Sequence, residues 1–417
     1  MNRREQGNPS KPVWLSTYTS VATFLLVAIA LVVPSGYSVG AVLLLLVTPI
    51  LLSKKNRPVV GRQDWAVIGV LLAYFLVCAF EVVWDGQSSS GFDKPSRFLL
   101  AVPVLLLLLA YPPKAAYLWA GLAAGGIVSG FWATWQKLAE GVSRAGGYTH
   151  VIQFGNLNML LGILCLAGLG WAYVQPRARL WFPFLLLGGV MGILGSLMSG
   201  SRGGWVGFPF VLLVLYQAYG RDLPRRWLAS LAVVVLVGAA AAYAIPQLGV
   251  QQRVHQAFSD ISRFVEQDNP TSSLGARFEM WGAAVTLIPE RPIVGWGSQG
   301  YLQARDRLVE QGRFHPIIQD YEHVHNEYLD AWVKRGFIGL IALLALYLVP
   351  LRLFAKRMKS ADLPLRALAT AGVLLPLAYM DFGLSQVFLS HNSGVMMFAF
   401  LLVVLWASVR SRERTGY

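Results

Sequence analysis

The sequence predicts an all-α, polytopic helical membrane protein with about twelve transmembrane helices. Of its 417 residues, 55% are hydrophobic and 13% are charged, about half of the roughly 25% found in soluble domains. The mean hydropathy is +0.52. The apolar residues form continuous runs, such as 41–52 and 98–110, whereas barrel strands alternate between apolar and polar residues. These observations exclude a soluble globular domain and a disordered chain, and they disfavour a barrel.

Twelve segments are long and apolar enough to be candidate membrane spans, because a span needs about 20 mostly apolar residues. In chain order they are 14–34, 37–53, 63–84, 97–112, 114–136, 155–174, 180–198, 204–220, 227–245, 336–354, 365–385 and 393–409.

The distribution of Lys and Arg predicts that both termini lie in the cytoplasm. In this orientation the inside segments hold 21 basic residues, including Arg3, Arg4 and Lys11, and the short outside segments hold five. Cytoplasmic loops of membrane proteins carry such an excess. The net charge of +14 is therefore interpreted as an orientation signal and not as evidence of a nucleic-acid partner.

The stretch between the ninth and tenth spans is the only one long enough to form an extramembrane domain. The expected organisation is transmembrane helices 1–9 in 1–245, a periplasmic loop domain in 246–335, and helices 10–12 with a short cytoplasmic tail in 336–417. Inside the loop the turn and capping residues predict helices at about 250–266, from Ser272 or Ser273 to about 288, at about 301–313 and at about 322–335, with turns at Asp268 to Pro270 and at Pro292 to Gly300.

The histidines favour proton-transfer chemistry on the outer side of the membrane, since histidine exchanges a proton near neutral pH. In a bacterium this is the periplasmic face. All six lie on the predicted outside: His150, His255, His315, His323, His325 and His391.

The outer turn Ser199–Trp205 (SGSRGGW) is a candidate anion site. Arg202 lies at the edge of the membrane, where a charge is costly and usually has a partner or a function. The glycines allow close approach of the backbone to a ligand, and the turn opens a helix whose free N–H groups attract anions. The alternative is an interfacial arginine that extends to lipid headgroups.

Two further motifs lie in the long loop. Arg277 and Trp281 share a helix face, which by itself indicates an ordinary salt bridge of Arg277 with Glu279 or Glu290. The second motif is Glu322–Asp330 (EHVHNEYLD). Two histidines two residues apart point in different directions on a helix and make a poor metal pair, and a solvated face is favoured for His323. A neighbouring carboxylate can orient a histidine ring, and Glu322, Glu327 and Asp330 all remain open for that role.

Other signals are weaker or missing. Arg144 and His150 can add to an anion site in the loop 139–154, and His391 with Asn392 is interpreted as a helix cap region. Cys78 and Cys165 lie in apolar runs and form no metal motif. The sequence contains no phosphate-binding loop, GxSxG elbow or acidic pair for a divalent ion. Carboxylates are nearly missing from the spans, which disfavours a proton-coupled transporter.

Taken together and in order, three motifs resemble the O-antigen ligase and O-antigen polymerase superfamily. They are SGSRGGW at 199–205, R-x3-W at 277–281 followed by P-x2-G-x-G at 292–297, and HNEYLDAWVKRGFIGL at 325–340. The motifs cover only about 199–340, whereas the twelve spans and the long loop resemble O-antigen ligase over the whole chain.

The resemblance implies a membrane-embedded glycosyltransferase of the C type in the bacterial inner membrane, with its active site facing the periplasm. It would transfer a polysaccharide from undecaprenyl diphosphate to a terminal sugar of lipid A-core, with inversion and without a metal or cofactor. His325 would be the catalytic base, and Arg202 and Arg277 would bind the diphosphate. Arg144, Glu322, Glu327 and Asn326 would support them.

Four alternatives are weighed. A structural scaffold of the envelope is disfavoured, because it would not need arginines near the membrane face or the His-Asn motif. Polymerases of the superfamily transfer the chain to a second lipid-linked repeat. Protein O-oligosaccharyltransferases are generally longer at the C-terminus, whereas about eight residues follow the last span here. A lipid or polysaccharide transporter would need no chemistry, and it is disfavoured by the histidines of the outer loop.

Overall fold

The structure is a computed structural model of the chain and describes residues 13–267 and 270–415. Within these ranges every regular element is an α-helix or a 3-10 helix. The α-helices are α1 (Val13–Ala28), α2 (Gly36–Val47), α3 (Arg62–Trp84), α4 (Asp93–Ala110), α5 (Ala115–Leu138), α6 (Val151–Ala167), α7 (Leu169–Tyr173), α8 (Ala178–Ser199), α9 (Phe208–Ala218), α10 (Arg225–Ala244), α11 (Val250–Gln267), α12 (Ser273–Leu287), α13 (Ser298–Glu310), α14 (Glu327–Ala355), α15 (Leu363–Gly383) and α16 (Asn392–Thr415).

The protein is a multi-pass helical membrane protein, as the sequence predicts. In the described residues eight helical segments are long and apolar enough to cross a membrane, namely α3, α5, α6 with α7, α8, α10, α14, α15 and α16. Two shorter apolar helices cover Trp14–Ala28 and Gly36–Leu52. The remaining predicted spans, 97–112 and 204–220, correspond to α4 and to the short α9. Each of the twelve predicted segments therefore contains a helix.

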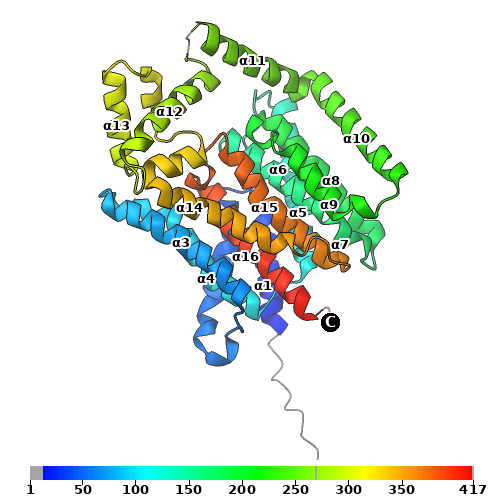
Figure 1. Cartoon of the computed structure of the whole chain (residues 1–417). Helices are drawn as coiled ribbons and strands as arrows, with labels where there is room; N and C mark the ends of the chain where they lie inside the picture. Colours follow the sequence, from blue (N-terminus) through cyan, green and yellow to red (C-terminus); the bar gives the residue numbers. More distant parts are fainter. Residues whose placement is uncertain (1–12, 268–269, 416–417) are drawn as a thin grey trace, which may run out of the picture.

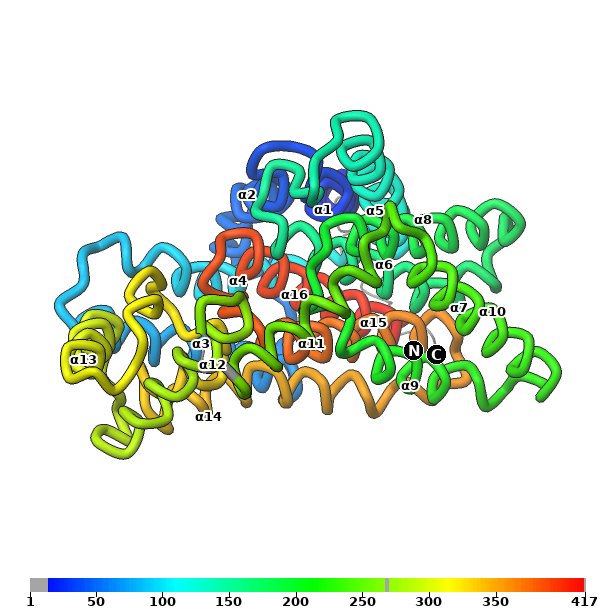
Figure 2. Tube along the Cα trace, turned by 90° about the horizontal axis from the view of Figure 1, so that it is seen from above, coloured from blue at the N-terminus to red at the C-terminus, as the bar shows by residue number. Residues whose placement is uncertain are grey.

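The bundle is organised around α16. In its most apolar stretch 94% of the residues are buried, against 83% for α6 with α7 and none for α10. Viewed from above, α16 lies in the middle, with α1 and α2 on one side and α14 on the other, while α10 lies at the outer edge (Figure 2). The start of α1 and the end of α16 lie at the same end of the bundle, opposite α12 and α13 (Figure 1).

A second, smaller apolar core lies between α12, α13 and the first turns of α14. Buried side chains of this core include Met280, Trp296, Tyr301 and Val333. Because it is separate from the large core of the bundle, the segment that we expected to form a loop domain has apolar packing of its own.

The turn 292–297 binds the backbone of α14 where that helix is kinked. Gly336 has φ 64° and ψ −166°, which breaks the helical path. Phe337 N–H donates to the Pro292 carbonyl at 2.8 Å, and Gly297 N–H donates to the Lys334 carbonyl at 2.8 Å. A Cβ on Gly336 would lie 2.1 Å from the Ile293 oxygen, so only glycine fits there. The P-x2-G-x-G motif therefore has a structural role, and the kink coincides with the predicted start of the tenth span.

The helices predicted in the long loop are largely confirmed. α11 matches the prediction of 250–266, and Ser272 caps α12 by accepting the Gly275 N–H at 3.0 Å. α13 begins three residues earlier than expected. Asp268 and Asn269 of the predicted turn, and Arg3, Arg4 and Lys11 of the orientation count, lie outside the described residues.

Two predicted boundaries are wrong. The helix expected at 322–335 begins only at Glu327, because the Asn326 Oδ1 accepts the N–H groups of Tyr328 and Leu329, both at 3.0 Å, and thereby caps α14. The span expected at 204–220 is α-helical only over 208–218, in α9. Gly200 (φ 62°) and the 3-10 turn Arg202–Gly204 interrupt the chain before it, and Pro209 lies in the first turn of the helix, which begins at Phe208.

Candidate active site

His325 lies in a non-helical segment directly before α14 and has a left-handed backbone, with φ 53°. Such a conformation costs a non-glycine residue about 1–3 kcal/mol, and strained residues of this kind cluster at functional sites. The prediction that His323 and His325 point apart on a helix is therefore wrong. Their rings lie 4.3 Å apart between centroids, at 86° to one another.

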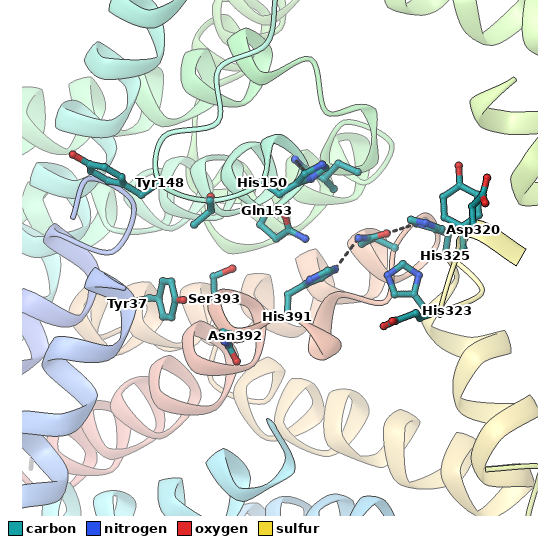
Figure 3. A pocket seen from close by; sticks show the side chains of 15 residues that line it. Tyr37, Tyr148, His150, Gln153, Asp320, His323, His325, His391, Asn392 and Ser393 are labelled. Carbon is teal, nitrogen blue, oxygen red and sulfur yellow. Dashed lines mark hydrogen bonds between the residues drawn. The ribbon is translucent and has the colours of Figure 1, made fainter. Parts of the chain in front are cut away.

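The hydrogen-bond partner of His325 is Gln386, in the segment between α15 and α16. The His325 Nδ1 bonds to the Gln386 Oε1, and the Gln386 Nε2 bonds to the His391 Nε2 at 2.8 Å (Figure 3). Because an amide oxygen only accepts, Nδ1 of neutral His325 carries the proton and its Nε2 has a free lone pair. Within the described residues, no hydrogen bond joins His325 to Glu322, Glu327 or Asp330.

His325 is held in its neutral form. Burial lowers the pKa of its imidazole to about 3. Repulsion from Arg277 and from the protonated forms of His323 and His391 lowers it further, whereas the hydrogen bond that His325 donates to Gln386 acts in the opposite direction. At neutral pH the ring is therefore unprotonated, and the lone pair of its Nε2 is free to face an acceptor hydroxyl.

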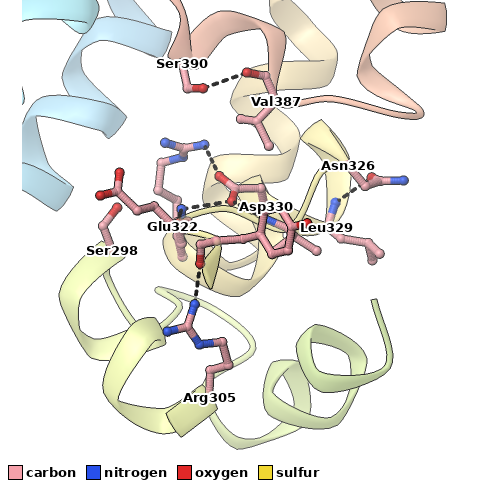
Figure 4. A network of polar contacts seen from close by, with 12 residues as sticks. Ser298, Arg305, Glu322, Asn326, Leu329, Asp330, Val387 and Ser390 are labelled. Carbon is pink, nitrogen blue, oxygen red and sulfur yellow. Dashed lines mark hydrogen bonds and ion pairs between the residues drawn. The ribbon is translucent and has the colours of Figure 1, made fainter. Parts of the chain in front are cut away.

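A network of buried polar contacts fixes the segment that carries His325 (Figure 4). Asp330 accepts the Val324 N–H at 3.2 Å and pairs with Lys334 at 2.9 Å. The Lys334 Nζ also donates to the Glu322 carbonyl at 3.0 Å. On the other side the Trp281 Nε1 donates to the Val324 carbonyl at 3.1 Å. The tryptophan of the R-x3-W motif therefore anchors the residue that precedes His325.

Glu327 joins this segment to the one that carries Gln386. Its carboxylate is 1% exposed and accepts the N–H groups of Phe388 at 2.5 Å and Leu389 at 3.1 Å. Glu327 and Asn326 therefore position the site through the backbone, and among the described residues neither forms a hydrogen bond with the His325 ring.

Arg202 lies in the turn between α8 and α9, close to two other arginines. Its guanidinium donates to the Arg253 carbonyl at 3.2 Å, and Arg144 donates to the Ser199 carbonyl at 2.9 Å. Arg253, on α11, packs so closely on Gly200 that a Cβ there would lie 3.0 Å from its Nε. Arg253 is a site residue that the sequence did not single out.

Four arginines of this region influence one another. Burial and the charges of Arg253, Arg202 and Arg277 lower the pKa of Arg144 to about 10. Burial also lowers the pKa of Arg202 and of Arg277, with added repulsion from Arg253 and from Arg202, respectively, while Asp260 acts in the opposite direction. In the described part of the chain none of the four forms an ion pair. A cluster of unpaired, partly desolvated guanidinium groups is suited to a polyanion.

The salt bridge expected for Arg277 taken alone is therefore not formed with the described carboxylates. The Glu279 carboxylate instead accepts the His315 N–H at 2.8 Å.

The arginine turn and the His325 segment meet at Ser385. A Cβ on Gly203 would lie 2.4 Å from the Ser385 Oγ, and the next residue is the Gln386 that bonds to His325. Arg277 in turn is close enough for its charge to lower the pKa of His325. The structure thus brings together the three sequence motifs that contain Arg202, Arg277 and His325.

A cavity of about 540 Å³ opens beside His325 (Figure 3). Its lining includes four of the six histidines but none of the four arginines. The lining residues are Tyr37, Tyr148, Thr149, His150, Ile152, Gln153, Asp320, Tyr321, Glu322, His323, His325, Gln386, His391, Asn392 and Ser393. His391, interpreted from the sequence as part of a cap region, therefore faces the same cavity as His325. Among the described residues no group of three or more His, Cys, Asp or Glu side chains is arranged to hold a metal ion.

The fold and the site define a multi-pass membrane protein with a neutral histidine beside an arginine cluster. A family model described as O-antigen ligase matches residues 187–344, which include Arg202, Arg253, Arg277 and His325. An uncharacterized protein of Haemophilus influenzae is 30% identical over 366 residues, covering 87% of this chain and 91% of that protein. An O-antigen ligase of Escherichia coli is 24% identical over 282 residues, covering 67% of this chain and 61% of that protein.

The chain belongs to the O-antigen ligase family. The family comprises glycosyltransferase-like ligases, so the chain has an enzymatic role.

Proposed function

We propose that the protein transfers a polysaccharide from undecaprenyl diphosphate to a terminal sugar of lipid A-core, the ligation step of lipopolysaccharide biosynthesis. One observation carries the proposal: a cluster of four arginines without ion-pair partners in the described residues lies beside a histidine whose Nε2 is free to accept a proton. The arginine cluster can bind a lipid diphosphate, and the free Nε2 can take the proton of an acceptor hydroxyl.

In the proposed reaction the His325 Nε2 accepts the proton of the acceptor hydroxyl. The hydroxyl oxygen forms a bond to the anomeric carbon of the donor sugar, on the face opposite the diphosphate. The bond between that carbon and the diphosphate oxygen breaks, and its electron pair leaves with undecaprenyl diphosphate. One bond forms as one breaks, so the configuration at the anomeric carbon inverts.

The arginines are assigned to the leaving group. Diphosphate becomes more negative as the bond breaks, so Arg202 and Arg277 bind it more strongly in the transition state than in the ground state. Arg144 supports them through its hold on the Ser199 carbonyl at the arginine turn. Four guanidinium groups supply the charge that a metal ion supplies in many diphosphate enzymes, so transfer should persist in EDTA. Inhibition by EDTA that added Mg²⁺ reverses would contradict this assignment.

We place the protein in the inner membrane with its active site facing the periplasm and both termini in the cytoplasm. The end of α16, which lies away from α12 and α13 (Figure 1), carries Arg410 and Arg412. Arg357, which follows α14, pairs with Glu413 near the same end at 2.6 Å. This gathering of basic residues agrees with an excess of positive charge on the cytoplasmic side. The segment 246–335 is then a periplasmic domain with its own small core.

A reconstituted assay tests the proposal. Purified protein receives undecaprenyl-diphosphate-linked polysaccharide with and without lipid A-core, and the products are separated by size. A new glycosidic bond formed only when lipid A-core is present supports ligation. Extension of the lipid-linked glycan without lipid A-core would indicate O-antigen polymerase instead. Movement of the donor across vesicles without any new bond would indicate a transporter.

A further inference from the structure

The cavity beside His325 and the arginine cluster are formed by different segments of the chain. The cavity is formed by Tyr37 at the start of α2, by residues 148–153 at the start of α6, by the segment 320–325, by Gln386 and by residues 391–393 at the start of α16. The arginines belong to the turn 199–205, to α11 and α12, and to Arg144, which turns toward Ser199. His325 lines the cavity, and it is also close enough to Arg277 for the charge of that residue to lower its pKa. The proposed base therefore lies between the two regions.

The lining of the cavity carries no cation at neutral pH. Burial lowers the pKa of His391 to about 4 and lowers the pKa of His323 and of His150 as well. The charge of Lys94 lowers the pKa of His391 further, and the charge of Arg144 lowers that of His150. Neither Lys94 nor Arg144 lines the cavity. Among the described residues that line the cavity, the only charged side chains are the carboxylates of Asp320 and Glu322, both on exposed residues. The cavity is thus neutral to negative, in contrast to the strongly positive region beyond His325.

The wall has the chemistry of a sugar site. Tyr148 is 58% exposed, and its ring packs against that of Trp132, with the centroids 4.8 Å apart and the planes tilted by 57°. Tyr37 supplies a second ring, while Thr149, Asn392 and Ser393 supply hydroxyl and amide groups that both donate and accept. Tyrosine combines an apolar ring with a hydroxyl group, so it can contact the apolar face of a sugar ring and form hydrogen bonds with its hydroxyl groups. The volume falls within the range of about 300–1,000 Å³ that is usual for small-molecule sites.

We infer that this cavity binds the terminal sugar of the acceptor and that it selects an uncharged, hydroxyl-rich sugar over one that carries a phosphate. The inference rests on the proposed function. Direct displacement requires the attacking hydroxyl to approach from the side opposite the leaving diphosphate, and the diphosphate belongs with the arginines. The acceptor therefore enters from the cavity side of His325. A phosphate monoester there would face Asp320 and Glu322 without a cation to pair with.

The first test measures steady-state kinetics with purified protein and two acceptors that differ only by a phosphate on the terminal hexose. The wild type should use the uncharged acceptor with a catalytic efficiency at least about tenfold higher. Tyr148→Ala should raise the KM for the acceptor about tenfold and leave the KM for the lipid-linked donor and the inhibition constant of inorganic diphosphate unchanged. Tyr173→Ala is the matched control, since Tyr173 is 72% exposed and lies outside the cavity.

A second variant adds the missing cation. Asn392→Lys places an ammonium group on the exposed rim of the cavity and should raise the efficiency with the phosphorylated acceptor, whereas Gln319→Lys, exposed but outside the lining, should not. Equal use of both acceptors by the wild type, or a Tyr148→Ala effect on the donor instead of the acceptor, would overturn the inference. If the wild type forms no new bond with either acceptor, the proposed function itself fails, which is a different outcome.

Discussion

The hydrogen bond between Gln386 and His325 leads to the sharpest prediction. Gln386→Leu removes the acceptor that keeps the proton on Nδ1 of His325 and removes the partner of His391. Both tautomers of the imidazole then become populated, and in one of them Nε2 carries a proton and cannot act as a base. Gln386 is a positioning residue in this scheme, because it acts through His325.

The size of the effect follows from the contact that is lost. A hydrogen bond of this kind contributes about 0.5–1.5 kcal/mol net, and leaving a buried donor unpaired costs about 1–3 kcal/mol. Since about 1.4 kcal/mol corresponds to a factor of ten in rate, kcat should fall by about 2- to 150-fold. His325→Ala should cost more, about 10²- to 10⁴-fold, because the general base itself is lost. The KM for the lipid-linked donor should not change in either variant.

If Gln386 had only a structural role, its substitution would not shift the pH profile of transfer. If Gln386 determines the proton position and the pKa of His325, its substitution should shift that profile. Gln386→Glu keeps an acceptor at the same place and adds a negative charge that stabilises the imidazolium. The pKa of His325 then rises from about 3, so the activity of this variant should be lost at a higher pH than that of the wild type as the pH falls. Transfer is measured between pH 4 and 9 with purified protein, and Gln319→Glu serves as the exposed control. A Gln386→Leu variant with wild-type kcat, together with an unshifted profile for Gln386→Glu, would refute the reasoning.

Three further predictions follow from the same contacts. Arg253→Ala should raise the KM for the donor and the inhibition constant of inorganic diphosphate by about tenfold, because the Arg253 guanidinium belongs to the arginine cluster. An unchanged inhibition constant would show that Arg253 is not part of the diphosphate site. Gly336→Ala should lower the melting temperature in detergent, since the positive φ at the kink costs a residue with a Cβ about 1–3 kcal/mol. Gly69→Ala in α3 is the control and should not lower it, because a Cβ there meets no atom within 4 Å. Equal melting temperatures of the two variants would contradict this account of the kink. The pKa values of His325 and His391 lie below their ordinary value of 6.5, so the unfolded chain takes up protons at a higher pH than the folded chain. The stability of the folded protein should therefore fall as the pH drops from about 6.5 toward 4. The melting temperature of His391→Asn should fall less over this window, and a fall equal to that of the wild type would argue against the burial of His391.

The sequence predicted the helices well where a single local pattern determines them. The apolar runs located all twelve helical segments, and Ser272 marked the start of α12. Local patterns failed where a long-range contact decides the backbone. The helix expected at 322–335 loses its first five residues, because the segment is bound by Trp281, Lys334 and Asp330.

The residues around His325 show the same limit. A charged neighbour in the chain was the natural candidate for orienting its ring, yet the partner is an amide 61 residues away. Nothing in the sequence singles out Gln386, since glutamine has no motif of its own and lies outside the three motifs. Arg253 was equally hidden, as one of several polar residues on an amphipathic helix, until packing placed it on Gly200.

The sequence by itself determined the class of protein and its expected orientation, because hydropathy and basic residues act through the membrane and need no tertiary contact. Only the tertiary structure decided which side chains form the site. The proton position on His325, its low pKa and the unpaired state of the arginines depend on burial and on neighbours from α8, α11, α12 and the segment before α16. Burial and proximity arise when distant segments pack, so no local pattern of residues can specify them.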